Sequence, residues 1–119
     1  MSIQSFKDLI VWQRSMGLAE EIYRLAAALP RDERFGLGGQ LKRAAVSVPS
    51  NIAEGYSRQS TGDYRHHLQI ARGSLGELET QLLLATRLGL LAAPCTALTD
   101  IEECSRMLNT MIRKLRREA

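Results

Sequence analysis

Apolar residues recur along this chain at steps of three and four, the spacing that places side chains on one face of a helix. Ser5 and Asp8 have capping-box spacing, so a first helix is expected to begin there and to close at Pro30, because proline cannot continue a helix. Two stripes run along it: Leu9, Trp12, Met16, Ala19, Tyr23 and Ala26, and beside them Leu18, Ile22, Leu25 and Leu29. Together they form a wider apolar face than a helix with a single neighbour needs.

A second helix is expected after the polar stretch 31–34, with Asp32 as its cap and its end near Gly55. Its apolar stripe consists of Leu37, Leu41, Ala44, Val48 and Ile52. Pro49 lies inside this segment, removes one backbone donor and crowds the preceding turn. We therefore expect one helix that is kinked around residues 48–50.

The third helix has the clearest pattern. Ser60 and Asp63 again have capping-box spacing, and Gly89 is expected to end the helix. Its stripe consists of Tyr64, Leu68, Ala71, Leu75, Leu78, Leu82 and Ala85. Pro94 suits the first turn of a fourth helix, whose stripe is Leu98, Ile101, Leu108, Ile112 and Leu115, interrupted at Ser105.

Short connections between four helices favour antiparallel neighbours. We therefore expect one all-α domain over residues 1–119, an up-down-up-down antiparallel four-helix bundle. Aromatic residues make up only 5% of the chain, which argues against a sandwich or barrel of short strands. A core built from 119 residues is small, and it would gain stability from packing against copies of the same chain.

Composition and charge are those of an ordinary globular protein, with 45% apolar and 24% charged residues. The first seven residues are polar and no apolar run is long enough to span a bilayer, so we expect a cytoplasmic protein without a membrane partner. Cys95 and Cys104 are expected to be reduced, small packing residues. The net charge of +3 is a mild basic excess, compatible with a nucleic-acid partner and equally with a solubilising surface.

The sequence contains no recognisable catalytic, cofactor or metal motif. Asp63 and His66 have a spacing that could share a metal, but the second motif that di-metal bundles use is absent, so His66 and His67 are interpreted as solvated. The segment with glycines 36, 38 and 39 is not followed by the lysine of a phosphate-binding loop. We interpret it as a flexible start of the second helix. We therefore expect a protein that is not an enzyme and has no cofactor.

A polar ribbon runs along one edge of the second apolar stripe. Folding the second and third helices antiparallel brings Arg43 level with Glu77. Buried polar groups need partners, so we predict an Arg43–Glu77 ion pair flanked by hydrogen bonds from Ser47, Asn51 and Ser74. We favour this structural network, which would fix the register of the two helices, over a ligand site.

The densest basic cluster of the chain lies near its end and consists of Arg113, Lys114, Arg116 and Arg117. Such a cluster can bind the phosphates of a nucleic acid. It also suits the carboxyl end of a helix, where cations complement the helix dipole, and both interpretations stay open. Repetition of the cluster around an oligomer would favour phosphate binding, because several modest basic patches would add up to one strong positive electrostatic field.

Three segments of the chain have distinctive sequences: Phe-Lys-Asp-Leu-Ile-Val-Trp-Gln at 6–13, the stretch 40–55 with Val-Pro-Ser-Asn-Ile-Ala-Glu-Gly at its end, and Gly-Ser-Leu-Gly-Glu-Leu-Glu at 73–79. In this order they resemble a four-helix-bundle family named for the 23S ribosomal RNA intervening sequence. The family in turn resembles accessory variability proteins of diversity-generating retroelements, basic pentameric barrels that engage nucleic acid and a reverse transcriptase. The resemblance therefore implies a four-helix bundle and a homopentamer.

The leading hypothesis is a homo-oligomer, a pentamer by this resemblance, that contacts the phosphates of structured RNA or DNA through its basic side chains. With few aromatic residues available for stacking on bases, we do not expect single-strand recognition. The alternative is a scaffold or adaptor that binds another protein through the apolar face of the first helix. A small enzyme is the least supported hypothesis.

Overall fold

The structure, a computed structural model, describes residues 2–118 apart from the side chain of Cys95. Within this range the chain forms four α-helices, two short 3-10 helices and no strand. The α-helices are α1 (Ile10–Ala27), α2 (Leu37–Tyr56), α3 (Thr61–Arg87) and α4 (Cys95–Glu118), and the 3-10 helices are η1 (Phe6–Asp8) and η2 (Arg31–Glu33). The all-α prediction is confirmed.

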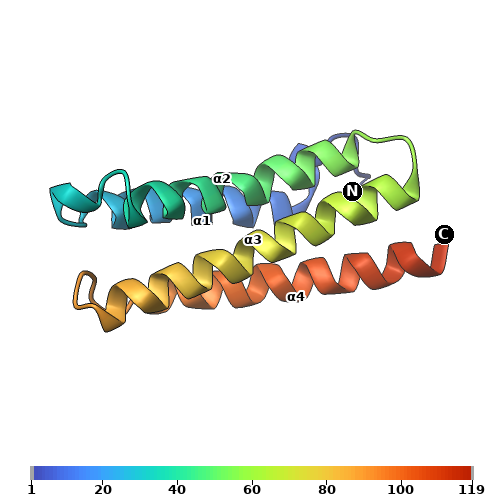
Figure 1. Ribbon diagram of the computed structural model, residues 1–119. Coiled ribbons are helices and arrows are strands. Elements are labelled where there is room, and N and C mark those ends of the chain that lie inside the picture. Colours follow the sequence, from blue (N-terminus) through green and yellow to red (C-terminus); the bar gives the residue numbers. More distant parts are fainter. Residues whose placement is uncertain (1, 119) are drawn as a thin grey trace.

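Successive helices run in opposite directions, and both ends of the chain lie towards the same end of the molecule (Figure 1). α1 packs against α2 and α4, and α3 also packs against α2 and α4, so the four helices close a ring around one core. The described chain measures 45 × 24 × 21 Å. This arrangement confirms the up-down-up-down antiparallel bundle.

The two apolar stripes of α1 have different environments. Leu18 and Ile22 of the second stripe are buried in the core, together with Val11. On the first stripe, Met16 is 39% exposed and Tyr23 46% exposed. The reason is geometric: α1 has only two neighbouring helices, and they cover the stripe that faces the core but not the one at its edge.

The stripe of α3 is buried along nearly its whole length, as predicted, with only Tyr64 partly exposed. On α4 the buried positions are Ala97, Ile101, Cys104, Leu108 and Ile112. The reduced Cys104 thus fills the place in the stripe where the neighbouring Ser105 breaks the pattern. The side chain of Cys95 lies outside the described residues.

The predicted cap at Ser5 forms one turn ahead of the helix. Ser5 and Asp8 make the full capping box, but they cap η1, and Leu9 is extended with ψ of 125°. Consequently α1 begins at Ile10. At α3 the Ser60 hydroxyl accepts a hydrogen bond from the Asp63 amide at 3.0 Å, as its spacing indicates.

The prediction that Asp32 caps α2 is wrong. Asp32 lies inside η2, and this extra turn moves the start of α2 to Leu37. Gly36 occupies the N-cap position without a side-chain cap, and the Glu33 carboxylate accepts a hydrogen bond from the Leu37 amide at 3.3 Å. α2 then continues through the buried Pro49 to Tyr56 as one helix, so its predicted end near Gly55 is confirmed.

Gly89 ends the α3 region as predicted, with φ of +75°, a conformation that glycine adopts without steric cost. The Gly89 amide bonds to the Thr86 carbonyl and the Leu90 amide to the Ala85 carbonyl, which is the Schellman arrangement. Pro94 directly precedes α4, and its carbonyl accepts the Leu98 amide at 3.0 Å. Among the described residues, no helix is long and apolar enough to cross a membrane.

Gly55 of α2 is buried against the beginning of α3. A Cβ atom at this position would stand 2.8 Å from the Cβ of His67 and 3.1 Å from Cδ1 of Tyr64. The first distance is shorter than carbon atoms tolerate, so the absence of a side chain at Gly55 sets how closely α2 and α3 approach each other.

We expect Gly55→Ala to lower the free energy of unfolding by about 1–3 kcal/mol, because the two helices must move apart to make room for the methyl group. The measurement is urea unfolding followed by circular dichroism. Gly73→Ala in α3 is the matched control, because no side chain and no other helix lies within 4 Å of the place that its methyl group would take. It should leave stability unchanged or raise it by up to about 1 kcal/mol. Equal effects of the two substitutions would contradict the close-approach explanation.

Candidate nucleic-acid interface and polar network

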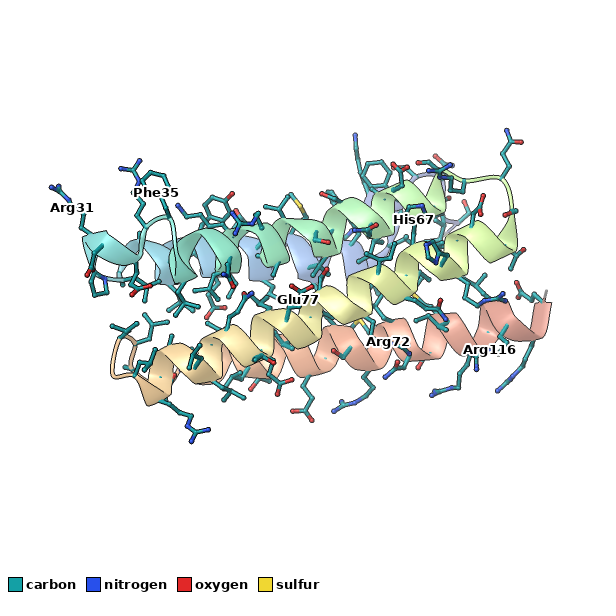
Figure 2. All side chains as sticks on the ribbon, viewed as in Figure 1. Arg31, Phe35, His67, Arg72, Glu77 and Arg116 are labelled. Carbon is teal, nitrogen blue, oxygen red and sulfur yellow. The ribbon has the colours of Figure 1, made fainter. Side chains whose placement is uncertain are left out.

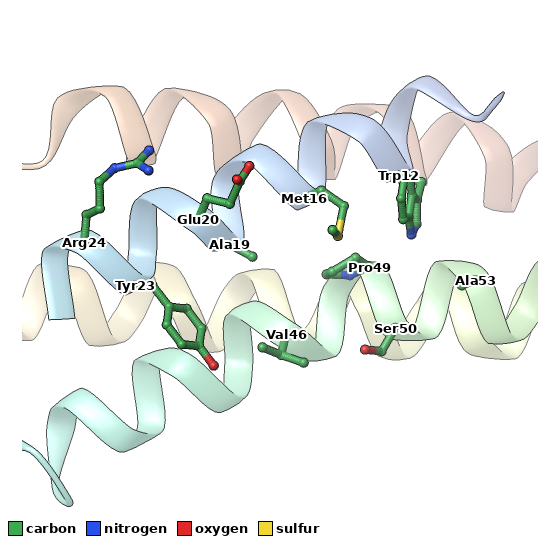
Figure 3. Close-up of a pocket in the computed structure, with 10 residues that line it drawn as sticks. All are labelled: Trp12, Met16, Ala19, Glu20, Tyr23, Arg24, Val46, Pro49, Ser50 and Ala53. Carbon is green, nitrogen blue, oxygen red and sulfur yellow. The ribbon is translucent and has the colours of Figure 1, made fainter. Parts of the chain in front are cut away.

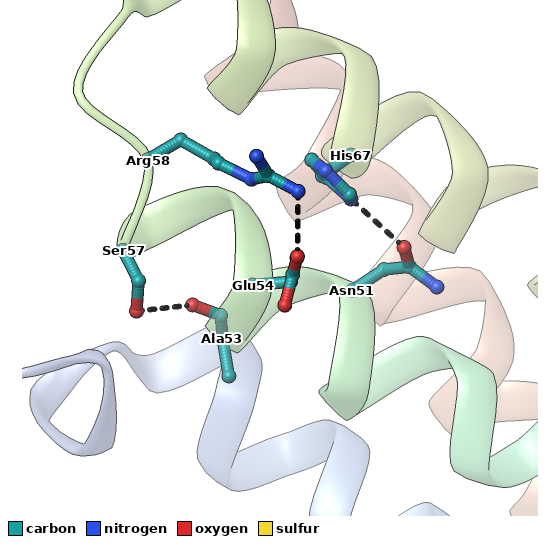
Figure 4. Close-up of polar contacts among 6 residues, drawn as sticks. All are labelled: Asn51, Ala53, Glu54, Ser57, Arg58 and His67. Carbon is teal, nitrogen blue, oxygen red and sulfur yellow. Dashed lines mark hydrogen bonds and ion pairs between the residues drawn. The ribbon is translucent and has the colours of Figure 1, made fainter.

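A chain of hydrogen bonds joins α2 to α3. The Ser74 hydroxyl donates to the Ser47 hydroxyl at 2.8 Å, and Nδ2 of Asn51 donates to the Ser47 hydroxyl at 3.0 Å and to its carbonyl at 2.9 Å. Oδ1 of Asn51 lies 3.0 Å from Nδ1 of His67 (Figure 4). A carboxamide oxygen only accepts, so this contact places the ring hydrogen of His67 on Nδ1.

Ser47, Asn51 and Ser74 are therefore hydrogen-bonded to one another, whereas the prediction had them flank an Arg43–Glu77 ion pair. His67, interpreted above as solvated, is a further member of this network. It was missed because its neighbour His66 occupies the next position along the helix, and only the packing of α3 on α2 shows which of the two faces Asn51. At the end of α2, Arg58 also pairs with Glu54 at 2.7 Å (Figure 4).

The predicted Arg43–Glu77 ion pair is not formed. The ion pairs among the described residues are Arg14–Glu103, Arg58–Glu54 and Arg106–Glu102. Arg43 and Glu77 are level with one another and line the same recess of about 360 Å³, but both are exposed. The Arg43 guanidinium lies back along α2, 3.5 Å from where a Cβ on Gly39 would stand. Exposed charges gain little from pairing, so nothing holds the two together.

Apolar surface lies on both sides of α1. Between α1 and α2 there is a groove of about 700 Å³, which we call the α1–α2 groove. Its apolar walls include Trp12, Met16 and Tyr23 from α1, and Val46 and Pro49 from α2 (Figure 3). A second hollow of about 710 Å³, the α1–α4 hollow, lies along the other edge of α1 and is lined largely by Ile3, Leu9, Ile10, Met107 and Met111.

The four cations predicted to bind phosphate are all exposed at the carboxyl end of α4. We call Arg113, Lys114, Arg116 and Arg117 the α4 basic cluster. None of them forms an ion pair with a described residue. Arg113 makes one long hydrogen bond, 3.5 Å, to the Thr110 hydroxyl.

The cluster is divided between two sides of α4. Arg116 follows Asn109 by seven residues and shares its face, which is turned towards α3, because Arg72 of α3 donates to Oδ1 of Asn109 at 2.8 Å. Lys114 follows Glu103 by eleven residues and shares its face, which is turned towards α1 through the Arg14–Glu103 ion pair. The structure therefore separates Lys114 from Arg116.

Cys104 and Tyr64 are the groups whose acidity the fold changes most. Burial, reinforced by the nearby Asp100 carboxylate, raises the pKa of the Cys104 thiol to about 11. Burial, with a smaller contribution from Tyr56, raises the pKa of Tyr64 to about 12. A thiol of such high pKa stays protonated near neutral pH and is a poor nucleophile. In the part of the chain that the structure describes, no three His, Cys, Asp or Glu side chains gather as metal ligands.

Residues 7–110 match the family described as 23S rRNA-intervening sequence protein. The chain belongs to this family. The fold is also similar to the crystal structure of a protein of unknown function from the S23 ribosomal protein family of Bacteroides thetaiotaomicron VPI-5482, with 26% identity and a TM-score of 0.81. That similarity covers 87% of this chain and 98% of the other. No curated protein matches the chain.

The three segments that resemble the 23S rRNA-intervening sequence proteins have structural roles that the fold makes visible. Segment 6–13 contains η1 and the first turn of α1, and segments 40–55 and 73–79 supply Ser47, Asn51, Gly55 and Ser74 at the contact between α2 and α3. The polar network therefore lies within the residues that match the family, whereas the α4 basic cluster begins beyond residue 110.

Asn51→Ala removes the link between Ser47 and His67, and we expect it to lower the free energy of unfolding by about 1 kcal/mol, since the better helix propensity of Ala offsets part of the loss. Urea unfolding at one fixed protein concentration measures the change. Glu77→Ala is the control and should stay within about 0.5 kcal/mol of wild type, because Glu77 is exposed and has no ion pair. A larger loss for Glu77→Ala than for Asn51→Ala would restore the ion-pair prediction.

Proposed function

We propose that this 23S rRNA-intervening sequence protein is a non-enzymatic homo-oligomer that binds the phosphate backbone of structured RNA or DNA. The α4 basic cluster carries the proposal: its four cations are exposed and unpaired among the described residues, and no acidic residue occurs from Ser105 to Arg117. Cations that are not already neutralised by carboxylates are free to displace the counterions of a phosphate backbone. Their position at the end of α4 also complements the helix dipole, and the two roles are compatible.

The proposed oligomer rests on the apolar surfaces that flank α1. A twofold dimer needs only one self-complementary patch, whereas a closed ring needs two different patches that meet head to tail. The α1–α2 groove and the α1–α4 hollow lie on opposite edges of one helix, which suits a ring. Five copies are the number expected from the family's resemblance to accessory variability proteins. A ring would bring several α4 basic clusters into one field and so strengthen a modest patch.

A protein scaffold is the second candidate, and the α1–α2 groove favours it. Trp12, Met16 and Tyr23 offer an apolar surface of the kind that receives the apolar face of a partner helix. Salt separates the two candidates, since phosphate binding weakens steeply with ionic strength and apolar docking does not. A partner that is retained on the immobilised protein at high salt, with no nucleic acid bound at low salt, would favour the scaffold.

We expect wild-type protein to be oligomeric and Val46→Glu to be monomeric, because the substitution puts a carboxylate into the α1–α2 groove. Val46 is 42% exposed, so the single chain should still fold. Light scattering coupled to size exclusion gives the mass, and circular dichroism checks the fold. Ile70→Glu is the control: Ile70 is 39% exposed and lies outside both apolar surfaces, so this variant should keep the wild-type mass. A monomeric wild type would contradict the proposal.

For nucleic-acid binding, we expect the variant with Arg113, Lys114, Arg116 and Arg117 all changed to Glu to lose affinity for structured RNA and duplex DNA. Fluorescence anisotropy at low and near-physiological salt measures the dissociation constant. Wild-type binding should weaken steeply as salt rises, by about tenfold or more for a fourfold rise in salt if at least two phosphates are contacted.

The control for this variant carries Glu in place of Arg31, Arg34, Arg43 and Arg87, which are exposed and lie in or after η2, in the first half of α2 and at the end of α3. Figure 2 shows Arg31 at one end of the bundle and Arg116 at the other. Both variants change the net charge from +3 to −5, since each of the four substitutions removes two charges. Equal losses in the two variants would mean that only overall charge matters, and no binding by wild type at low salt would reject the nucleic-acid role.

A further inference from the structure

We propose that the phosphate-binding surface spans two helices, and that Arg65 and Arg72 of α3 complete it. The ligand of this surface is the backbone of a double-helical nucleic acid. The inference rests on the proposed function and deepens it, because it adds two residues to the α4 basic cluster and names the form of the nucleic acid.

The register of α3 against α4 places Arg65 and Arg72 beside the α4 basic cluster. Arg72 donates from Nη1 to Oδ1 of Asn109 at 2.8 Å, so these residues are level with one another. The helices are antiparallel, and seven residues make about two turns. Arg65, seven positions before Arg72, is therefore on the same edge of α3 and level with Arg116, seven positions after Asn109. Figure 2 shows Arg72 and Arg116 along this α3–α4 edge.

Arg113 and Arg117 lie on the outward side of α4, next to the face that carries Arg116. We define the α3–α4 basic strip as Arg65, Arg72, Arg113, Arg116 and Arg117. No member of the strip forms an ion pair with a described residue. Lys114 lies further round α4, on the side of the Arg14–Glu103 ion pair and three residues before Arg117, so it flanks the strip.

The strip has a defined end. No acidic residue occurs between Tyr64 and Gly76 on α3 or between Ser105 and Arg117 on α4. Beyond the strip, Glu79 follows Arg72 by seven residues on the same edge, and Glu102 pairs with Arg106 at 3.1 Å. Five unpaired cations are thus gathered at one end of the α3–α4 hairpin, and the carboxylates begin where the strip stops.

The dimensions of the strip suit a duplex. From the level of Arg72 to that of Arg117 is about 12 Å along the helix, and neighbouring helix axes are about 8–10 Å apart. This length corresponds to the rise of about four base pairs. No aromatic side chain belongs to the strip, so it offers no surface on which unpaired bases could stack. All five members are arginines, whose planar fork of donors fits phosphate oxygens.

The bond between Arg72 and Asn109 also prepares the strip for binding. It uses one nitrogen of the guanidinium and leaves the remaining donors of Arg72 for a phosphate. An arginine that is already held in place loses less conformational entropy when it binds. We therefore expect Arg72 to contribute as much as the arginines of α4.

The test is fluorescence anisotropy with a short labelled RNA duplex, the DNA duplex of the same sequence and the RNA single strand, each over a series of KCl concentrations. Arg65→Ala/Arg72→Ala should weaken duplex binding about tenfold at low salt and make the slope of log Kd against log salt shallower by about 2, one phosphate per arginine. Arg31→Ala/Arg34→Ala, which removes two exposed charges at and just after η2, is the charge-matched control and should stay within about twofold of wild type. Arg65→Lys/Arg72→Lys should keep most of the slope, because counterion release depends on charge.

The results that would overturn the strip differ from those that would overturn the proposed function. Wild-type affinity in the Arg65→Ala/Arg72→Ala variant, with binding lost in the α4 cluster variant, overturns the strip alone. No loss in either variant overturns both. If Arg65→Lys/Arg72→Lys loses as much affinity as Arg65→Ala/Arg72→Ala, the strip is also overturned. That result would indicate a packing role for the two arginines rather than a phosphate contact. Single-strand binding tighter than duplex binding overturns the choice of ligand, whereas binding of either duplex supports it.

Discussion

The approach of α2 to α3 is the constraint on which the rest of this molecule depends. Gly55 lets the two backbones come so close that a single methyl group would collide with His67. One and two turns further along, Asn51 bonds to His67 and Ser47 bonds to Ser74, so steric fit and hydrogen bonds specify the same register. A slip by one turn would break both at once and leave the buried Ser74 hydroxyl without its partner.

This register determines what the other two helices can do. With α3 fixed on α2, α4 packs along the far edge of α3, and α1 closes the ring between α2 and α4. Leu18 and Ile22 of α1 then enter the core, while Met16 and Tyr23 remain at its edge. The apolar surface on both sides of α1 is thus a consequence of a wide apolar helix that packs against two α-helices, α2 and α4, in the part of the chain that the structure describes. That unsatisfied surface is the physical basis for proposing further copies of the chain as partners.

The packing of the helices also determines which charged side chains are paired. In the first half of α1 and of α4, Arg14 and Glu103 neutralise one another across the helix contact. Towards the carboxyl end of α4 the cations have no such partners among residues 2–118, and the first half of α3 adds Arg65 and Arg72 beside them. A chain with a net charge of only +3 can therefore present a locally strong positive surface. The mild overall charge is a poor guide to what this end of the bundle can bind.

The sequence by itself determined the four helices, their order and the buried stripe of α3, because these depend on periodicity and on local signals such as Ser60 and Gly89 that act within a few residues. It also placed Ser47, Asn51 and Ser74 in one network, since helical spacing predicts which side chains share an edge. Only the tertiary structure decided that His67 rather than Arg43 completes the network, that Glu33 rather than Asp32 accepts from the first amide of α2, and that Lys114 and Arg116 face different helices. Those outcomes depend on distances between elements to within about 1 Å, and a long, exposed side chain such as Arg43 can reach several partners at similar free energy.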